Sequence, residues 1–453
     1  MSTGAASSIS DRLERIPFNR IHRNFLLMVA AGEFVETLML LGNGVVLAMI
    51  ATVLHFSDVV STYVVPVSFF AGEFLGSIVL GYLSDRLGRR TVFAYDLLIF
   101  GGGMIVAAFF SDPVPIAIFV FIAGAGVGGE FPLVDTYTTE VFPGAQRGRR
   151  MATVYTLAVI AAPVIAVLAY LLSHPQPGPF SWRILFWVMG ALALVVWLIR
   201  LRLPESPRWF EVRGRQEEAE RGIAEMEEQA MRELGLEELP PPPERVLVAG
   251  APPRWRDIWA PDLRGRTLMM LVFQFFQSGI FYGFTALAPT FLLHKGIGLV
   301  HTLLFTIIID FGYLAGSIVN IFLIDRVERK WGIVVTAILA GVLGTVFVIV
   351  PNVVVTVILG FLVTFTLWNF SNFQHTFQAE VFPTRVRSSA AGTVYSVSRI
   401  STSILVLVIT AFFLPHGLLA TYGLIWVFIL VVVVVIGGFG PRTSRRRLEE
   451  IAQ

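Results

Sequence analysis

Acidic side chains occur inside long apolar stretches of this sequence, where an ionised group is costly. Seven acids are placed in this way: Glu33, Glu36, Glu73, Asp96, Glu130, Asp135 and Asp310. An isolated charge at the middle of a bilayer costs on the order of 3 kcal/mol or more, so such a group pairs, faces a water-filled cavity or takes up a proton. At about 1.5 Å per helical residue, Glu36, Glu73 and Glu130 lie roughly 15 to 18 Å deep, near the midplane.

These depths predict proton-binding chemistry. Glu33 and Glu36 are separated by one helical turn and therefore share a face. Two carboxylates that share a site cannot both ionise cheaply, so one of them should hold its proton near neutral pH. We expect Glu36 to be the principal proton carrier with Glu130 as its partner, and Glu33, Glu73 and Asp135 to be further candidates. Asp135 lies close to a basic cluster, where a structural ion pair is an equal alternative.

The second half of the chain carries uncharged polar side chains at similar depths. Amides within a membrane helix more often join helices than bind a ligand, but their clustering here favours hydrogen bonding to a polar solute. Arg399 is the single deep basic residue, and its partner could be a substrate carboxylate or one of the acids. For His375 we expect packing at a helix end. The predicted substrate site comprises Gln274, Gln277, Tyr282, Trp368, Asn369, Asn372 and Arg399.

Membrane helices must position these residues. The chain is 55% hydrophobic and 15% charged, with a mean hydropathy of +0.73, which excludes an ordinary soluble enzyme. Apolar stretches of about 20 residues, the length that crosses a bilayer as a helix, predict an all-α integral membrane protein with twelve transmembrane helices. The predicted spans are 25–53, 62–83, 91–110, 115–140, 151–173, 184–203, 267–292, 302–324, 333–350, 353–381, 389–413 and 420–440.

The sequence repeats itself at an offset of 240 residues in two places. Residues 139–155 (TEVFPGAQRGRRMATVY) match 379–395 (AEVFPTRVRSSAAGTVY), and residues 82–90 (YLSDRLGRR) match 322–330 (FLIDRVERK). Two motifs that share one offset indicate two pseudo-symmetric six-helix halves in parallel orientation, at 25–203 and 267–440. Proteins built in this way usually move a solute between their halves.

The basic residues are distributed unevenly between the two sides of the predicted bundle. Only Arg183 and Lys295, of 34 Lys and Arg residues, fall in loops on the side away from the termini. The positive-inside rule therefore predicts cytoplasmic termini in a plasma-membrane protein. We expect an interfacial segment at 1–24, a cytoplasmic linker at 204–266 and a tail at 441–453. The chain has no cysteine, so disulfides and thiolate metal sites are excluded.

The motifs that flank the spans resemble those of the major facilitator superfamily. The stretch GYLSDRLGRR at 81–90 looks like its signature loop, and PESPRW at 204–209 looks like a signature of the sugar-porter and metabolite:proton symporter branches. In the second half, Glu328 stands where a glycine is usual, and in the first span Met39 stands where a second acid is common. The resemblance implies a cytoplasmic gate made of Gly81, Asp85, Arg86, Gly88, Arg89, Arg90, Glu140, Arg147, Asp325, Arg326, Arg329, Glu380 and Arg387.

The combined prediction is a secondary active transporter that works by alternating access, with protons as the coupling ion and symport favoured. The deep acids outnumber the one deep arginine, which argues against a multiply charged anion and leaves sugars, polyols, monocarboxylates and cations as solutes. The alternatives are a proton antiporter that exports cationic or amphipathic compounds and a non-transporting nutrient sensor. An enzyme is not expected, because no HExxH or GxSxG motif is present. We expect no cofactor, no nucleic-acid partner and a functional monomer in the lipid bilayer.

Overall fold

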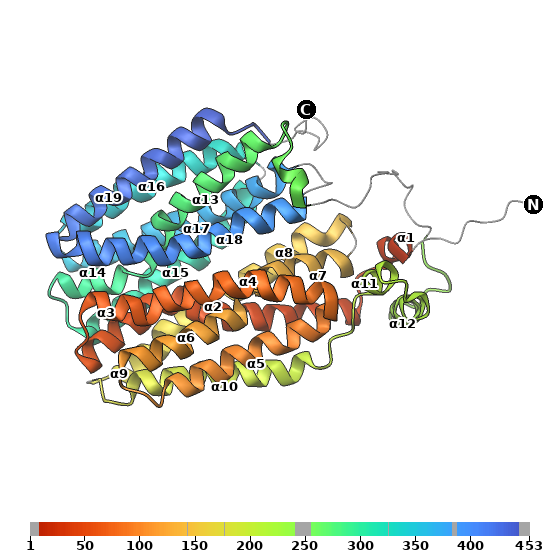
Figure 1. Cartoon of the computed structure of the whole chain (residues 1–453), viewed down its shortest axis with the longest axis horizontal. Coiled ribbons are helices and arrows are strands. Elements are labelled where there is room, and N and C mark those ends of the chain that lie inside the picture. The colour runs from red at the N-terminus through yellow and green to blue at the C-terminus, as the bar shows by residue number, and fades with distance from the viewer. Residues whose placement is uncertain are drawn as a thin grey trace, which may run out of the picture.

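The computed structural model describes residues 9–142, 144–175, 177–240, 255–324, 326–382 and 387–443. All regular elements in these ranges are helical, and most of them run along one direction in an elongated bundle (Figure 1). The short helices α1 (Ile9–Glu14) and α11 (Pro207–Val212), together with α12 (Gln216–Leu234), lie beyond one end, which we call the linker end. The opposite end, which we call the distal end, holds α3 and α14.

The helices of the two halves follow the predicted spans closely. The first half contains α2 (Arg20–Leu54), α3 (Asp58–Thr62) with η1 (Tyr63–Val67) and α4 (Ser68–Leu87), α5 (Arg89–Ala107), α6 (Pro113–Val127) with α7 (Glu130–Val141), α8 (Gly144–Val159) with α9 (Ala161–Ser173), and α10 (Ser181–Arg200). The second contains α13 (Arg264–Thr285) with α14 (Ala288–His294), α15 (Leu299–Leu323), α16 (Arg329–Ile349), α17 (Val353–Val381), α18 (Arg387–Val408) with η3 (Ile409–Phe413), and α19 (Leu418–Val434) with η5 (Val435–Phe439). The all-α membrane fold is therefore confirmed.

The fourth span is broken. Eleven helices within the described ranges are long and apolar enough to cross a membrane, whereas the span predicted at 115–140 consists of the short helices α6 and α7. Gly128 and Gly129 separate them, and a Cβ atom at Gly128 would lie 2.2 Å from the carbonyl oxygen of Glu73. The glycine therefore lets the helix junction press directly against α4, and Glu130 begins the second helix.

The linker docks on the N-terminal segment. Arg12 and Arg15 of α1 form ion pairs with Glu227 of α12 at 2.6 and 2.7 Å. Ile9 and Leu13 are buried in the same cluster of apolar side chains as α12. The apolar face of α1, for which the sequence predicts a membrane interface, is thus covered by protein.

The two halves meet at the distal end. His294 at the end of α14 contacts Asp58 at the start of α3, with 2.7 Å between Nε2 and Oδ2. Thr62 and Thr410 form a hydrogen bond of 3.1 Å across the same interface. Deeper in the bundle, α9 packs along α15. These contacts hold the halves together on the distal side.

A buried arginine joins four helices of the first half. Arg200 at the end of α10 is 0% exposed, and both oxygens of Glu130 accept its hydrogen bonds, one of them at 2.8 Å. Asp96 lies 3.6 Å from the same guanidinium, and the carbonyl oxygens of Met28 and Phe93 each accept a hydrogen bond at 3.3 Å. Arg200 thus fixes α10 against α2, α5 and α7.

Replacing Arg200 by methionine should lower the free energy of unfolding by about 3–5 kcal/mol, because Glu130 then stays buried without its partner. The double variant Arg200→Met with Glu130→Met should recover much of that loss, since two apolar side chains need no ion pair in this environment. Denaturant titration of the purified protein in detergent, followed by tryptophan fluorescence, gives the free energies. An Arg200→Met protein as stable as the wild type would contradict the stabilising role of Arg200.

The distal contact between His294 and Asp58 should respond to pH. The hydrogen bond to Asp58 raises the pKa of His294, which lies outside the membrane-spanning segments. The contact therefore stabilises distal closure fully below the ordinary histidine pKa of about 6.5, and this contribution is lost as pH rises through the raised value. Because both side chains are partly exposed, we expect an effect of at most about 1 kcal/mol.

Cysteine labelling measures this closure without background, because the chain has no cysteine of its own. Thr62→Cys places a thiol at the closed interface, and its labelling by a thiol reagent should be slower at about pH 6 than at about pH 8. The matched variant that also carries His294→Gln should keep only the intrinsic pH dependence of the thiol. Equal pH profiles in the two proteins would rule out the histidine contact as the sensor.

Candidate functional site

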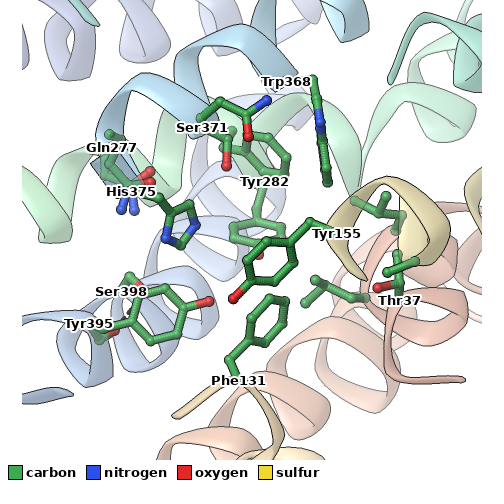
Figure 2. A pocket seen from close by; sticks show the side chains of 16 residues that line it. Thr37, Phe131, Tyr155, Gln277, Tyr282, Trp368, Ser371, His375, Tyr395 and Ser398 are labelled. Atoms are coloured by element: carbon green, nitrogen blue, oxygen red, sulfur yellow. Dashed lines mark hydrogen bonds between the residues drawn. The ribbon is translucent and has the colours of Figure 1, made fainter. Parts of the chain in front are cut away.

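A cavity with a volume of about 80 Å³ lies between the two halves. Its wall is formed by α2, α7 and α8 of the first half and by α13, α17 and α18 of the second (Figure 2). The lining residues are Thr37, Leu40, Leu41, Phe131, Tyr155, Ala158, Gln277, Phe281, Tyr282, Trp368, Ser371, Asn372, Gln374, His375, Tyr395 and Ser398. A site shared by two halves is positioned for a solute that both halves must hold in turn.

Aromatic rings dominate this wall, and amide and hydroxyl groups lie between them. Figure 2 shows the rings of Phe131, Tyr155 and Tyr395 below His375 in the view, and Tyr282 and Trp368 to its right. Rings offer flat apolar contacts, and the amides and hydroxyls offer both donors and acceptors. None of the described lining residues is acidic or carries an ammonium or guanidinium group. The cavity therefore suits a small polar solute with one flat apolar face.

The structure divides the predicted substrate residues into two layers. Gln277, Tyr282, Trp368 and Asn372 line the cavity. Gln274 lies behind, where its side-chain oxygen accepts a hydrogen bond of 2.7 Å from Gln277 and its nitrogen donates to Gln378. The Gln274 amide therefore holds the Gln277 amide in place and orients it.

Asn369 is the other residue of the second layer. Its side-chain oxygen accepts a hydrogen bond of 3.1 Å from Asn320 of α15, and its nitrogen donates to the carbonyl of Phe365 at 2.9 Å. The amide oxygen thus joins α17 to α15, and the amide nitrogen bonds to the backbone of α17 itself. His375, for which packing at a helix end is expected, lines the cavity instead.

Arg399 sits directly behind the cavity wall in a cluster of charges. It is 3% exposed, and its guanidinium lies 3.2 Å from Glu73 and 4.0 Å from Glu36. Its Nη1 donates to the hydroxyl of Tyr282 at 2.9 Å, and its Nη2 donates to the hydroxyl of Tyr395 at 2.7 Å. The arginine comes from the second half and both carboxylates from the first, so this cluster, which we call the interhalf cluster, spans the interface.

The remaining predicted proton carriers lie elsewhere. Glu130 is engaged by Arg200, on the linker side of the cavity. Glu33 is fully buried one helical turn from Glu36 on α2. The side chain of Asp135 lies outside the described part of the structure. The geometry thus brings Glu36 and Glu73 together on Arg399, whereas Glu130 pairs with Arg200.

The signature loop of the first half is held by a carboxylate from the linker. Both oxygens of Glu205 accept hydrogen bonds from the backbone of the loop, from Arg89 N at 3.0 Å and from Arg90 N at 3.2 Å. These amides begin α5, where an anion is favoured by the unpaired N–H groups. Gly88 precedes them with φ of +101°, and a Cβ atom there would lie 2.3 Å from Glu205 Oε2. The backbone conformation therefore favours glycine, and a side chain there would displace the Glu205 carboxylate.

The corresponding loop of the second half differs. Glu328, which stands at the glycine position, has an ordinary φ of −62°, and its side chain accepts a hydrogen bond from Thr443 N at 3.0 Å. Arg329 lies 3.5 Å from Glu380, and Arg326 is exposed. The ion pair between Arg329 and Glu380 joins α16 to α17 within the second half.

Gly81, another predicted gate residue, lies on α4, and a Cβ atom there would have no neighbour within 4 Å. The side chains outside the described part of the structure are those of Asp85, Arg86, Glu140, Arg147, Asp325 and Arg387.

Sequence reasoning missed several residues of the site, and one signal for them was present. Tyr155 and Tyr395 are a matched pair of the 240-residue repeat, and both line the cavity. A polar residue repeated at the same depth in both halves is a candidate for a site on the pseudo-symmetry axis. Phe131 and Phe281 carried no such signal, since they sit among many phenylalanines.

Comparison with known proteins gives one consistent result. The family model described as sugar (and other) transporter matches residues 21–453. The putative metabolite transport protein YyaJ of Bacillus subtilis is 26% identical over 99% of this chain and 98% of the relative. The niacin transporter NiaP of Acinetobacter baylyi is 27% identical over 97% and 98%. The crystal structure of a D-xylose-proton symporter matches with a TM-score of 0.71 at 18% identity, over 94% of this chain and 99% of that one.

The extent of the family match decides the class of protein. It covers both halves, the cavity between them and the linker. The solved structure supports the same helical bundle. The chain is an integral membrane protein of a transporter family and not an enzyme. It belongs to the sugar (and other) transporter family of the major facilitator superfamily.

Proposed function

We propose that this transporter couples the movement of a small polar organic solute to protons, in symport, by alternating access to the cavity. The observation that carries the proposal is the interhalf cluster. Two carboxylates, Glu36 and Glu73, share the single guanidinium of Arg399 in a fully buried position. The cluster is electrically neutral only when one carboxyl group holds a proton, and neutrality is strongly favoured inside a membrane.

The cluster connects proton binding to movement of the halves. Arg399 belongs to α18, whereas Glu36 and Glu73 belong to α2 and α4. A rocking motion that opens either side changes the distances between them. A carboxylate that loses its arginine must gain a proton or water, so the conformations should differ in their affinity for protons.

The choice of residues differs from the sequence-based prediction in one respect. Glu36 keeps its role as proton carrier, and Glu73 replaces Glu130 as its partner. Both oxygens of Glu130 are engaged by an arginine of the same half, so a rocking motion leaves that pair intact.

We further propose that the linker end faces the cytoplasm of the cell and the distal end faces outward. Of all the lysines and arginines, only Arg183 and Lys295 fall in distal loops of the predicted topology, as the positive-inside rule requires. The named relatives suggest two solutes for a first test, a sugar and an aromatic monocarboxylate. The niacin transporter and the D-xylose-proton symporter are similar over nearly the whole chain.

The variants Glu36→Gln and Glu73→Gln should exchange solute but lose accumulation driven by a pH gradient, because the cluster no longer needs a proton for neutrality. Uptake of radiolabelled niacin and D-xylose into proteoliposomes, with and without an inward proton gradient, measures accumulation, and counterflow measures exchange. Asp310→Asn is the matched control, since it removes a buried carboxyl group of the second half outside the cluster. A Glu36→Gln protein that still concentrates solute as the wild type does would refute the assignment.

The two layers of amides should respond differently to truncation. Gln277→Ala and Asn372→Ala each remove a hydrogen-bonding group from the cavity wall, so KM should rise by about two- to tenfold with little change in protein level. Asn369→Ala should instead lower the thermal stability of the purified protein, because it leaves Asn320 of α15 buried without this partner. Initial uptake rates and melting curves separate these outcomes. Equal effects on KM in all three variants would show that the two layers do not differ in their contribution to solute binding.

A further inference from the structure

The guanidinium of Arg399 does not line the cavity, but two of its hydrogen-bond partners do. The hydroxyl groups of Tyr282 and Tyr395 accept its hydrogen bonds, and both tyrosines form part of the cavity wall (Figure 2). A solute in the cavity therefore touches these two rings without touching the arginine.

The same arginine faces the carboxylates on its other side. Its donors form a fixed planar fork, so a partner that shifts on one side changes the geometry on the other. Glu73 lies 3.2 Å from Nη1, which also donates to Tyr282. Glu36 lies 4.0 Å from Nη2, which also donates to Tyr395. Each tyrosine thus shares one nitrogen with one carboxylate.

The tyrosine rings are held by residues of the opposite half. Phe70 of α4 packs against Tyr282 with ring centroids 4.7 Å apart, and Phe131 of α7 lies 6.1 Å from Tyr395. Phe131 also packs on the guanidinium of Arg399 at 5.3 Å. Occupancy of the cavity and rocking of the halves therefore act on the same two phenol groups.

We propose that Tyr282 and Tyr395 are positioning residues that transmit solute occupancy to the Arg399–Glu73–Glu36 cluster, and so tie proton binding to solute binding. This inference rests on the proposed proton-coupled transport. With solute bound, the tyrosine hydroxyls hold the guanidinium of Arg399 in one orientation toward Glu36 and Glu73. Without these hydroxyls the solute still binds in the cavity. The interhalf cluster then gains and loses its proton independently of solute binding.

The test uses Tyr282→Phe, Tyr395→Phe and the double variant, which keep both rings and remove only the hydroxyls. Tyr313→Phe is the matched control, because it removes a buried hydroxyl that bonds to Thr285 and not to Arg399. Full-length proteins are reconstituted into proteoliposomes, and uptake of radiolabelled niacin or D-xylose is measured together with the internal pH. The readouts are the number of protons moved per solute and the rate of solute counterflow.

Both tyrosines line the cavity, so we expect the double variant to show a moderately higher KM for counterflow. Accumulation at a given pH gradient, measured at saturating solute, should fall at least about fivefold further than the maximal rate of counterflow does. The single variants should show intermediate losses, and they keep the test available if the double variant does not fold. Tyr313→Phe should couple normally. Wild-type coupling in the tyrosine variants would overturn this inference alone, whereas a wild-type protein without pH-driven uptake of either solute would overturn the proposed function first.

Equilibrium binding supplies a readout that a merely structural role would not change. Coupling between two ligands is reciprocal, so a proton that is tied to the solute must alter the apparent Kd of the solute by the same factor. In the wild type the Kd should differ by about fivefold or more between about pH 6 and pH 8, and in the double variant it should be nearly constant. An unchanged pH profile in the double variant would also overturn the proposal.

Discussion

The structure depends on the cost of placing guanidinium groups inside a membrane. Arg200 and Arg399 are both nearly fully buried, and each is compensated by carboxylates that are buried as well. A charge in this environment is tolerated only with close partners, and its partners are constrained in turn. The two arginines therefore fix the rotation of the helices that carry the acids.

The two clusters have different consequences because of where their members come from. Arg200 and Glu130 belong to the same half, so their pair makes that half a rigid unit. Arg399 and Glu73 belong to different halves, so the proposed rocking of the halves would strain or break their pair. Rigid halves and a labile contact between them are both required for alternating access. Under the proposed mechanism, the same kind of interaction would stabilise one half at Arg200 and change during transport at Arg399.

Hydropathy was sufficient to predict the helices, since a span needs little more than length and apolar composition. It failed at Gly128 and Gly129, where close contact with the backbone of Glu73 ends one helix and starts another. Depth along the chain predicts Glu36 and Glu73 at one level, and in the structure both lie beside Arg399, but depth alone could not assign this partner. Arg200 lies near the end of the span predicted at 184–203, and the sequence indicates no partner for it, because only the folded half places it beside Glu130, 70 residues away in sequence.

The position of the interhalf cluster also bears on the type of solute. A cationic solute could replace the proton as the charge that neutralises Glu36 and Glu73, as an antiporter would require. It would first have to pass the rings of Tyr282 and Tyr395, whose hydroxyls already engage the arginine. No described lining residue carries a carboxylate that could attract such a cation into the cavity. A neutral or weakly anionic solute meets neither obstacle, so the arrangement favours a solute that binds beside the proton over one that competes with it.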